Sequence, residues 1–499
     1  MDLSSTVRAV MTRDPDGRAI EYRDHWYTWR YVTGVVADLD RQLDAAGLGR
    51  GTPVGLVARN RPAIVAAILG LIAGERCIVM IYSAQSTERM ANEVRALNLP
   101  VLVADAGDWT PELCAAAAET GTIGVSLDPA SDAPVSLVPG LEHLGKGPYR
   151  PAQPDIAAEL LSSGTTGAPK RIPLKRSTLA GAFADAAATY APGSADALQK
   201  PGIIIHPLGN IAGMTFLIPL AVQGQPVALL EKFRLDAWLD LVKRHKPART
   251  SLPTAVLRMI LDAKVPREAL GEIGVVGVGG GKLTVELQDE FEAAYGLPLL
   301  TAYGATEFCG VIVNWSADLY KKFGKEKRGS VGLPRPGAEI RVVDEIDGHV
   351  LPPGQTGVLE AKVDRVGPDW IHTTDLASID ADGFLYIHGR ADQAINRGGF
   401  KVLPEQVAAA LREHPAIADA AVLGLPDARV GEVPVAALET RGGPAPSSAE
   451  LEKFARARLV AYQLPTRYFV FDALPRTESM KVNLPELRRL IDARLAEAA

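Results

Sequence analysis

One glycine- and hydroxyl-rich stretch carries the residue types needed to hold phosphate groups. Residues 160–174 read LLSSGTTGAPKRIPL. Glycines let backbone N–H groups converge on an anion, hydroxyls donate further hydrogen bonds, and Lys170 adds positive charge. The spacing is not that of a Walker A loop, and an ordinary surface loop is the alternative; the closeness of Pro169 and Lys170 to the glycines favours a phosphate-binding loop. The candidate residues are Ser162, Ser163, Gly164, Thr165, Thr166, Gly167 and Lys170.

A second group of candidate residues follows two apolar strands in the middle of the chain. The strand within GEIGVVGVGGGKLT runs directly into the glycines at 279–281, which let a ligand lie against bare backbone. The segment LPLLTAYGATEFCG then places Tyr303, Thr306 and Glu307 at the end of another strand. Ligands of open α/β sheets bind at the carboxyl ends of strands, so both segments predict a binding site.

The elements that must position these residues alternate between strand and helix. Residues 52–60, 75–82, 101–107 and 122–128 read as short strands, with helical or alanine-rich segments between them. Such alternation predicts an α/β fold whose large N-terminal domain has mixed, mostly parallel sheets flanked by helices.

Two later regions follow other patterns. Residues 329–387 are short, alternating and turn-rich, which predicts a small β-barrel-like subdomain or a distorted sheet. After Arg390 come a helix, two strands, a second helix and a further strand, the pattern of a small α+β domain. The predicted boundary between the large and small domains therefore lies near Arg390.

Composition limits the classes of function. The chain has 499 residues, enough for two or more domains, with 47% hydrophobic and 22% charged residues. A net charge of -6 gives no reason to expect a nucleic-acid partner. Three widely spaced cysteines fit a reducing compartment. No signal peptide or membrane-spanning run is evident, so we expect a cytoplasmic protein.

Five motifs together resemble the adenylate-forming superfamily of acyl-CoA synthetases, peptide-synthetase adenylation domains and luciferases. SSGTTGAPK looks like its phosphate loop, YGATE like its YGxTE motif, and GSVGLPRPG like its GSVGxPxPG motif. GRADQAINRGGFKVLPEQV is similar to its hinge region, and LPRTESMK to its LPRTxxGK motif. Their order along almost the whole chain implies ATP-dependent activation of a carboxylic acid to acyl-AMP, followed by transfer to coenzyme A.

The resemblance implies roles on the phosphate side of an ATP site. Thr165, Thr166 and Lys170 would hold the β- and γ-phosphates, Thr306 would contact the α-phosphate, and Glu307, with Thr166, would bind Mg²⁺. Two anions, the acid and the nucleotide, must meet here, which requires positive charge and oriented N–H groups.

The same resemblance implies the adenosine side. Tyr303 would stack on adenine against Gly280 and Gly281, Asp375 would accept both ribose hydroxyls, and Arg390 would contact the ribose or the phosphates. The residues assigned to ATP or AMP are Ser162, Ser163, Gly164, Thr165, Thr166, Gly167, Lys170, Gly280, Gly281, Tyr303, Gly304, Thr306, Asp375 and Arg390.

The C-terminal motifs imply a moving domain. Lys481 would lie between the substrate carboxylate and the α-phosphate, and Thr306 and Glu307 would complete the catalytic set. Asp392 matches the hinge residue; rotation there would remove Lys481 and present Gly398, Gly399 and Lys401 to the pantetheine arm of coenzyme A. The predicted boundaries are 1–389 for the N-terminal domain, 390–395 for the hinge and 396–499 for the small mobile C-terminal domain.

Two departures from the motifs concern the shape of the acyl pocket and the shape of the turn that carries Lys481. HPLGNIAGM resembles PLFHxxG, but Gly209 and Asn210 replace its aromatic residue and histidine; with Ala305 they are assigned to the acyl pocket. Loss of the ring predicts a wider pocket for a bulky or long hydrophobic acid, unless a neighbouring side chain fills the space. Met480 replaces the glycine before Lys481, which predicts a differently shaped turn.

Three alternatives to a coenzyme A ligase remain. A stand-alone adenylating enzyme would pass acyl-AMP to a separate carrier protein or partner enzyme, since the sequence shows no fused carrier domain. A luciferase-type oxidation shares the first step. A non-catalytic nucleotide-binding protein would keep the fold alone, although Lys170, Glu307, Asp375 and Lys481 argue against it. The expected partners are the small acid, ATP and coenzyme A, and the resemblance allows a homodimer.

Overall fold

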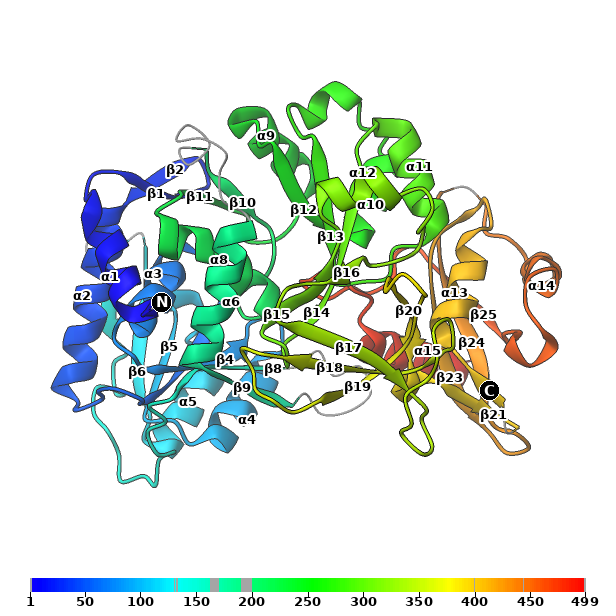
Figure 1. Cartoon of the computed structure of the whole chain (residues 1–499). Helices are drawn as coiled ribbons and strands as arrows, with labels where there is room; N and C mark the ends of the chain where they lie inside the picture. The colour runs from blue at the N-terminus through cyan, green and yellow to red at the C-terminus, as the bar shows by residue number, and fades with distance from the viewer. Residues whose placement is uncertain are drawn as a thin grey trace.

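The computed structural model places helices around five β-sheets in the part of the chain it describes (Figure 1). The described residues are 2–129, 131, 133–161, 170–189, 200–398, 400–442 and 444–497.

The largest sheet lies in the N-terminal half and has seven strands in the order β7-β6-β5-β3-β4-β8-β9. Five of them run parallel, and β7 and β9 pair antiparallel at the two edges. The central strands are continuous apolar runs because helices cover both faces of the sheet. The strands are β3 (Pro53–Ala58), β4 (Cys77–Tyr82), β5 (Val101–Asp105), β6 (Ile123–Leu127), β7 (Val135–Leu137), β8 (Ile156–Leu161) and β9 (Arg171–Lys175).

Helices of the same half pack on this sheet, and one of them is buried all round. Every residue of α3 is buried, which agrees with its uniformly apolar sequence. The sequence reading places a helical segment between residues 60 and 75, where α3 lies, whereas α1 went unrecognised. The helices are α1 (Leu3–Arg13), α2 (Trp29–Ala45), α3 (Pro62–Ala73), α4 (Thr87–Leu97), α5 (Pro111–Thr120) and α6 (Arg176–Thr189).

Two further mixed sheets complete the main body of the N-terminal part. One has the order β10-β11-β1-β2 and the other β12-β13-β14-β15-β16; in each, three strands run parallel. The strands are β1 (Arg18–Tyr22), β2 (His25–Thr28), β10 (Gly202–Ile204), β11 (Val227–Leu229), β12 (Arg249–Pro253), β13 (Val275–Gly279), β14 (Leu299–Ala305), β15 (Gly310–Asn314) and β16 (Leu333–Pro334). The helices are α8 (Ile211–Gln223), α9 (Leu235–His245), α10 (Thr254–Asp262), α11 (Val285–Tyr295) and α12 (Ala317–Phe323).

The turn-rich region forms a four-stranded antiparallel sheet. Its strands follow one another in the order β17-β18-β19-β20, so the distorted-sheet alternative describes it better than a barrel. The strands are β17 (Ala338–Val343), β18 (Gly357–Val363), β19 (Ile371–Ile379) and β20 (Leu385–Arg390).

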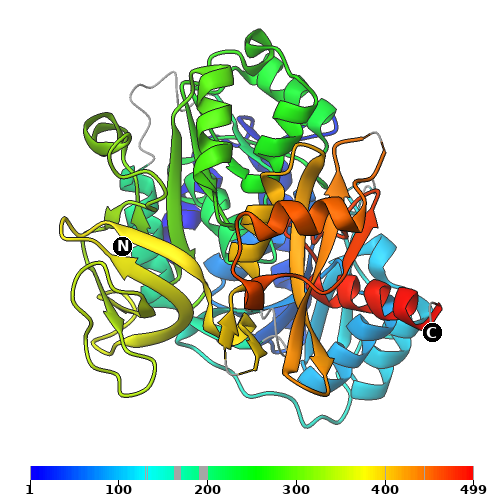
Figure 2. The same ribbon diagram turned by 90° about the vertical axis from the view of Figure 1, so that its right-hand side faces the viewer.

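The C-terminal part is a small α+β unit with its own sheet and cores. Figure 2 shows it lying in front of the larger N-terminal part. The strands are β21 (Ile395–Arg397), β22 (Phe400–Val402), β23 (Ile417–Asp427), β24 (Gly431–Thr440) and β25 (Tyr468–Phe471), and the helices are α13 (Pro404–Arg412), α14 (Ser448–Arg456) and α15 (Leu484–Glu497). The predicted fold class is confirmed: a large N-terminal domain of mixed sheets and a smaller C-terminal domain.

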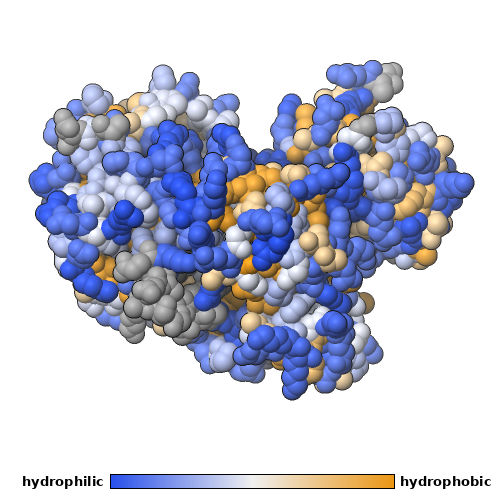
Figure 3. All heavy atoms as spheres, turned by 90° about the horizontal axis from the view of Figure 1, so that it is seen from above, coloured by the Kyte–Doolittle hydropathy of each residue, from blue (hydrophilic) through white to orange (hydrophobic). Residues whose placement is uncertain are grey.

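A deep notch separates two lobes of the molecule. Seen from above, apolar atoms gather at the floor of this notch (Figure 3). Among the helices described, none combines the length and the apolar character that crossing a membrane requires.

Candidate active site

A large cavity runs between the N-terminal sheets and the C-terminal unit. Its walls contain residues from the ends of β13, β14, β19 and β20 and from the loop before α15. The carboxyl ends of β13, β14 and β20 therefore meet in the cavity, as expected for ligand sites in α/β folds, and β19 contributes its amino-terminal half. Of the predicted site residues, the structure brings together in these walls Lys170, Gly209, Asn210, Gly280, Gly281, Tyr303, Gly304, Ala305, Thr306, Glu307, Asp375, Arg390, Asp392 and Lys481.

Tyr303, Asp375 and Arg390 form one polar wall of the cavity. The Tyr303 hydroxyl donates a hydrogen bond of 2.5 Å to Oδ2 of Asp375. Asp375 and Arg390 face each other across β19 and β20 as paired residues of the antiparallel ladder. Burial first, and then the neighbouring Asp375 carboxylate, raises the pKa of Tyr303, so its hydroxyl stays protonated. This pairing fixes the Asp375 carboxylate beside the phenol ring.

Two glycines shape the backbone around this wall. Gly280 has φ of 78°, a left-handed conformation that favours glycine. At Gly304 a side chain would collide with the Gly310 carbonyl, because an added Cβ would lie 2.3 Å from that oxygen. The backbone of β14 can therefore lie this close to β15 only with glycine at 304.

Lys481 comes from the C-terminal unit and reaches the same cavity. A methyl group placed on Gly280 would lie 3.7 Å from Cε of Lys481, so the lysine lies directly over the glycine segment. The surrounding protein lowers the pKa of Lys481 through desolvation, the Arg390 guanidinium lowers it further, and the Asp375 carboxylate opposes both. The ammonium group therefore lies among the residues predicted to bind ATP.

Thr306 and Glu307 follow β14 at the edge of the cavity. Thr306 is buried, and its carbonyl accepts a hydrogen bond of 2.9 Å from the Cys309 amide, which forms a tight turn. The Glu307 carboxylate interacts electrostatically with both Tyr303 and Arg390. A carboxylate oxygen in this position suits Mg²⁺, which prefers oxygen ligands.

The predicted hinge includes Arg390, a residue of the polar wall. Arg390 forms an ion pair of 2.6 Å with Asp392 in the short 3₁₀ helix Ala391–Gln393, and this hydrogen bond is the main cause that raises the pKa of Arg390. Residues predicted for the coenzyme A step lie elsewhere. Gly398 and Lys401 are absent from the cavity walls among the residues described, and Lys401 forms an ion pair of 2.6 Å with Glu345.

The wall assigned to the acyl group is built from small residues and two stacked rings. Gly209 lies against β3, where an added Cβ would be 3.3 Å from the Ala58 methyl group. The Asn210 side chain caps α8 by accepting a hydrogen bond of 2.9 Å from the Gly213 amide. His206 and Phe216 stack with ring centroids 4.7 Å apart, and burial lowers the pKa of His206 to about 4, which keeps the imidazole neutral. Of the described side chains, the Ala58 methyl group is the one that lies next to the point from which a ring at 209 would extend.

The proposed phosphate loop falls largely outside the described residues. Ser162, Ser163, Gly164, Thr165, Thr166 and Gly167 are not among them, and neither is Gly399. Lys170 is described and lines the cavity.

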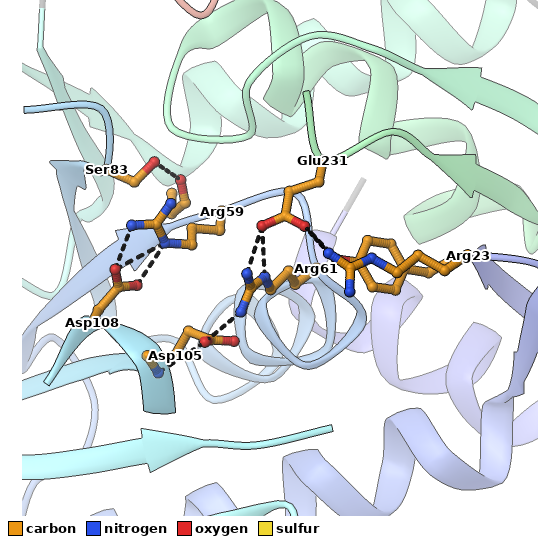
Figure 4. A network of polar contacts seen from close by, with 10 residues as sticks. Arg23, Arg59, Arg61, Ser83, Asp105, Asp108 and Glu231 are labelled. Atoms are coloured by element: carbon orange, nitrogen blue, oxygen red, sulfur yellow. Dashed lines mark hydrogen bonds and ion pairs between the residues drawn. The ribbon is translucent and has the colours of Figure 1, made fainter. Parts of the chain in front are cut away.

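Sequence reasoning missed a polar network at the end of β3. Arg59 donates hydrogen bonds through Nε to both carboxylate oxygens of Asp108, at 2.9 and 2.8 Å. Figure 4 shows Arg61, two residues later in the chain, turned instead towards Asp105 and Glu231. The sequence signal was present, since two arginines directly follow a buried strand, but their acidic partners lie far away in the chain.

Comparison with known proteins agrees with this geometry. The protein-family profile described as "AMP-binding enzyme" matches residues 7–366, and "AMP-binding enzyme C-terminal domain" matches residues 406–481. The chain belongs to the AMP-binding enzyme family. The superfamily resemblance inferred from the five motifs is thereby confirmed, and the second match ends at Lys481.

Members of this family with curated names resemble the chain over nearly its full length. A 2-succinylbenzoate–CoA ligase of Bacillus velezensis is 28% identical, with 97% of each chain covered. The 4-coumarate–CoA ligase 3 of Oryza sativa subsp. japonica is also 28% identical, with 95% of this chain and 88% of the relative covered.

Solved structures of the family share the fold. The o-succinylbenzoate CoA synthetase MenE of Bacillus subtilis, solved with its acyl-adenylate intermediate, matches with a TM-score of 0.78 at 26% identity over 98% of this chain and 97% of that one. The same enzyme with ATP and magnesium matches with a TM-score of 0.77, also at 26% identity, over 98% of this chain and 99% of that one.

Proposed function

We propose that this chain is an AMP-forming acid:CoA ligase, which activates a carboxylic acid with ATP and then forms an acyl-CoA thioester. Its curated relatives are named as acid:CoA ligases, and a structural neighbour holds an acyl-adenylate. One observation carries the proposal: Lys481 of the C-terminal unit lies in the same cavity as the Tyr303–Asp375 pair, against the Gly280 backbone.

The first step joins two anions. A carboxylate oxygen attacks the α-phosphorus of ATP, a new P–O bond forms, and the bond to pyrophosphate breaks. Lys481 would lie between the two reactants and offset their charge as the transition state forms. Tyr303 and the glycines would enclose adenine, and Asp375, held by the Tyr303 hydroxyl, would accept the ribose hydroxyls. Mg²⁺ would neutralise phosphate charge, and Glu307 offers it a carboxylate oxygen.

The second step needs a different arrangement of the small domain. The thiolate of coenzyme A attacks the acyl carbonyl carbon and AMP leaves, so Lys481 must make room. We place the hinge at residues 390–395, between an N-terminal domain of 1–389 and a mobile domain of 396–499. Gly398, Gly399 and Lys401 would then face pantetheine. In support, Gly398 has φ of 57° and so forms a turn without a bulky side chain.

The acid we propose is bulky or long and hydrophobic. The sheet contributes the small residues Ser251, Gly277 and Ala302 to the cavity wall, and α8 contributes Thr215 and Phe216. Aromatic acids such as those in the relatives' names, 2-succinylbenzoate and 4-coumarate, are the first to test.

Acid-dependent exchange of labelled pyrophosphate into ATP tests the proposal directly. The assay uses a panel of aryl, fatty and short carboxylic acids with wild type and Lys481→Ala, and thioester formation is followed on each acid that responds. Exchange that disappears in the variant, together with a thioester product, is the expected result. Exchange without a thioester would favour a carrier protein or partner enzyme as acceptor. ATP binding with no exchange on any acid would favour the non-catalytic alternative.

Two further expectations accompany the function. ATP and coenzyme A are cytoplasmic substrates and the three cysteines are free, which supports a cytoplasmic location. A homodimer stays a prediction, which size-exclusion chromatography with light scattering would test.

A further inference from the structure

The turn that carries Lys481 has a strained residue at its end. The hairpin is closed by a bridge between Arg476 and Val482, and the Met480 amide donates a hydrogen bond of 2.9 Å to the Thr477 carbonyl. Met480 has φ of 62°, the left-handed conformation that glycine adopts without cost. Met480 therefore holds a backbone conformation that glycine would adopt without strain.

Met480 makes an apolar contact across the domain boundary. Its side chain packs against the buried core cluster built on β12, β13, α10 and α11 of the N-terminal domain. Among the described residues that pack on this cluster from outside, Met480 is the one contributed by the C-terminal domain. A glycine at this position would remove the backbone strain and also this contact.

Glu478, two residues earlier in the same turn, makes a polar contact across the boundary. Its backbone N–H donates to the Tyr82 hydroxyl at 3.4 Å, and its carboxyl group lies beside the Ser83 hydroxyl, which itself donates to the Ala58 carbonyl. The carboxylate also faces the positive charges of Arg59 and Lys232. Tyr82 and Ser83 lie at the carboxyl end of β4, and Arg59 follows β3, so the N-terminal domain supplies this socket from adjacent strands.

The socket is already ordered within the N-terminal domain. Asp108, with a 4% exposed side chain, holds the Arg59 guanidinium through two hydrogen bonds from Nε (Figure 4). Arg59 therefore need not be immobilised when Glu478 arrives, which lowers the entropic cost of docking. By contrast, the ion pairs Lys401–Glu345 and Arg441–Asp262 across the same boundary are solvent-exposed on both sides.

We propose that Glu478 and Met480 are positioning residues that clasp the N-terminal domain and hold Lys481 in place for acyl-AMP formation, and that both must release before thioester formation. The inference rests on the function proposed above. The two contacts flank the turn on its polar and apolar sides, and they join the lysine's own loop to the domain that holds the rest of the site. Interactions made in only one of two arrangements shift the equilibrium between them.

Separate assays of the two half-reactions test the clasp. The variants are Glu478→Ala, Met480→Gly and the double variant, with Glu478→Gln as the conservative change that keeps a hydrogen-bonding group beside Ser83. Glu452→Ala is the matched control, because Glu452 pairs with Arg456 on its own helix. We expect the double variant to lose at least tenfold in the turnover number of pyrophosphate exchange, whereas thioester formation from supplied acyl-AMP stays within twofold. Glu478→Gln should recover most of the loss.

A double-variant cycle checks that the contact itself is responsible. Tyr82→Phe removes the hydroxyl that the Glu478 amide binds. Glu478→Ala leaves that backbone N–H in place and removes the carboxyl group. Combined with Tyr82→Phe it should add less than the sum of the two single effects, because the Tyr82 hydroxyl and the Glu478 carboxyl group interact electrostatically within one docking site.

A third measurement needs no acid. Trypsin cleavage after Arg476 and Lys481 is followed in the presence of ATP and Mg²⁺, because the clasped turn is shielded by the N-terminal domain. The double variant should be cut several times faster than wild type and Glu452→Ala. Equal losses in both half-reactions, or unchanged exchange and cleavage, would overturn the proposal. If none of the acids tested supports pyrophosphate exchange by wild type, the proposed function fails. The cleavage rates alone then test whether Glu478 and Met480 clasp the N-terminal domain.

Discussion

The C-terminal domain carries predicted site residues at two ends, and one end lies in the cavity whereas the other lies outside it. The turn before α15 is docked: Lys481 lies over Gly280, and Met480 packs into the N-terminal core. The hairpin of β21 and β22 is undocked from the site: Lys401 pairs with Glu345, and Phe400 is 57% exposed. One rigid domain therefore presents its adenylation end and keeps its other end outside the cavity. A fixed arrangement could serve only the first step, which is the physical reason to expect a rotation.

Removal of the docked lysine should have the largest effect. We expect Lys481→Ala to lower the turnover number of pyrophosphate exchange by roughly 10²–10³-fold, the size seen when one preorganised charge-stabilising group is lost. Thioester formation from supplied acyl-AMP should change little, because the proposed rotation removes Lys481 from the cavity before that step. A parallel loss in that second assay would mean that the lysine acts in both steps and would remove the contrast between the two ends.

Variants of the undocked hairpin should show the reverse pattern. Gly398 has φ of 57°, so Gly398→Ala strains the turn by about 1–2 kcal/mol. We expect thioester formation to slow by about tenfold, since 1.4 kcal/mol corresponds to a factor of ten, while pyrophosphate exchange stays unchanged. Single-turnover measurements of each half-reaction check this. Equal slowing of both would indicate that the substitution disturbs the whole domain.

The sequence alone located most of this arrangement, because the signals were local. Buried strands such as β3 and β5 read as apolar runs between turn residues, and Lys481 was found from the motif around it. Contacts between distant segments could not be read in this way. Arg59 and Asp108 are 49 residues apart, and Glu478 reaches Tyr82 across 396 positions. The left-handed conformation of Met480 also could not be read from its residue type, because the local rule predicts glycine at such a position.

The pH dependence of closure should distinguish the docked turn from the hairpin. Burial raises the pKa of Glu478 in the docked turn, while Arg59 and Lys232 oppose that shift and Asp108 adds to it. A carboxyl group with a raised pKa binds its proton more tightly in the docked state, so docking strengthens as the pH falls through that pKa and weakens as the pH rises. The distance between fluorescent labels on the two domains should be measured from pH 7.5 down to 5. In wild type the population of the docked state should rise a few-fold over this range.

Glu478→Gln supplies the control for that measurement. The amide keeps the size of the side chain but cannot titrate, so closure should lose this part of its pH dependence and should resemble wild type at low pH. Lys481, whose pKa is lowered, acts in the opposite direction, favouring closure as the pH rises. An unchanged pH profile in Glu478→Gln would show that another group controls closure.

The exposed ion pair at the edge of the boundary should matter least. Arg441 and Asp262 are 2.7 Å apart, with side chains 29% and 37% exposed. Pairs of this kind contribute ~0–1 kcal/mol and are weakened by salt. Arg441→Ala should therefore reduce pyrophosphate exchange by no more than about twofold to fivefold at low ionic strength. The reduction should be smaller at about 0.5 M salt, where the Debye length is on the order of 4 Å and exposed charges are screened. Only a contact shielded from water escapes screening by salt. A larger, salt-independent loss would therefore mean that the Arg441–Asp262 pair, and not the partly buried contacts of Glu478 and Met480, positions the C-terminal domain.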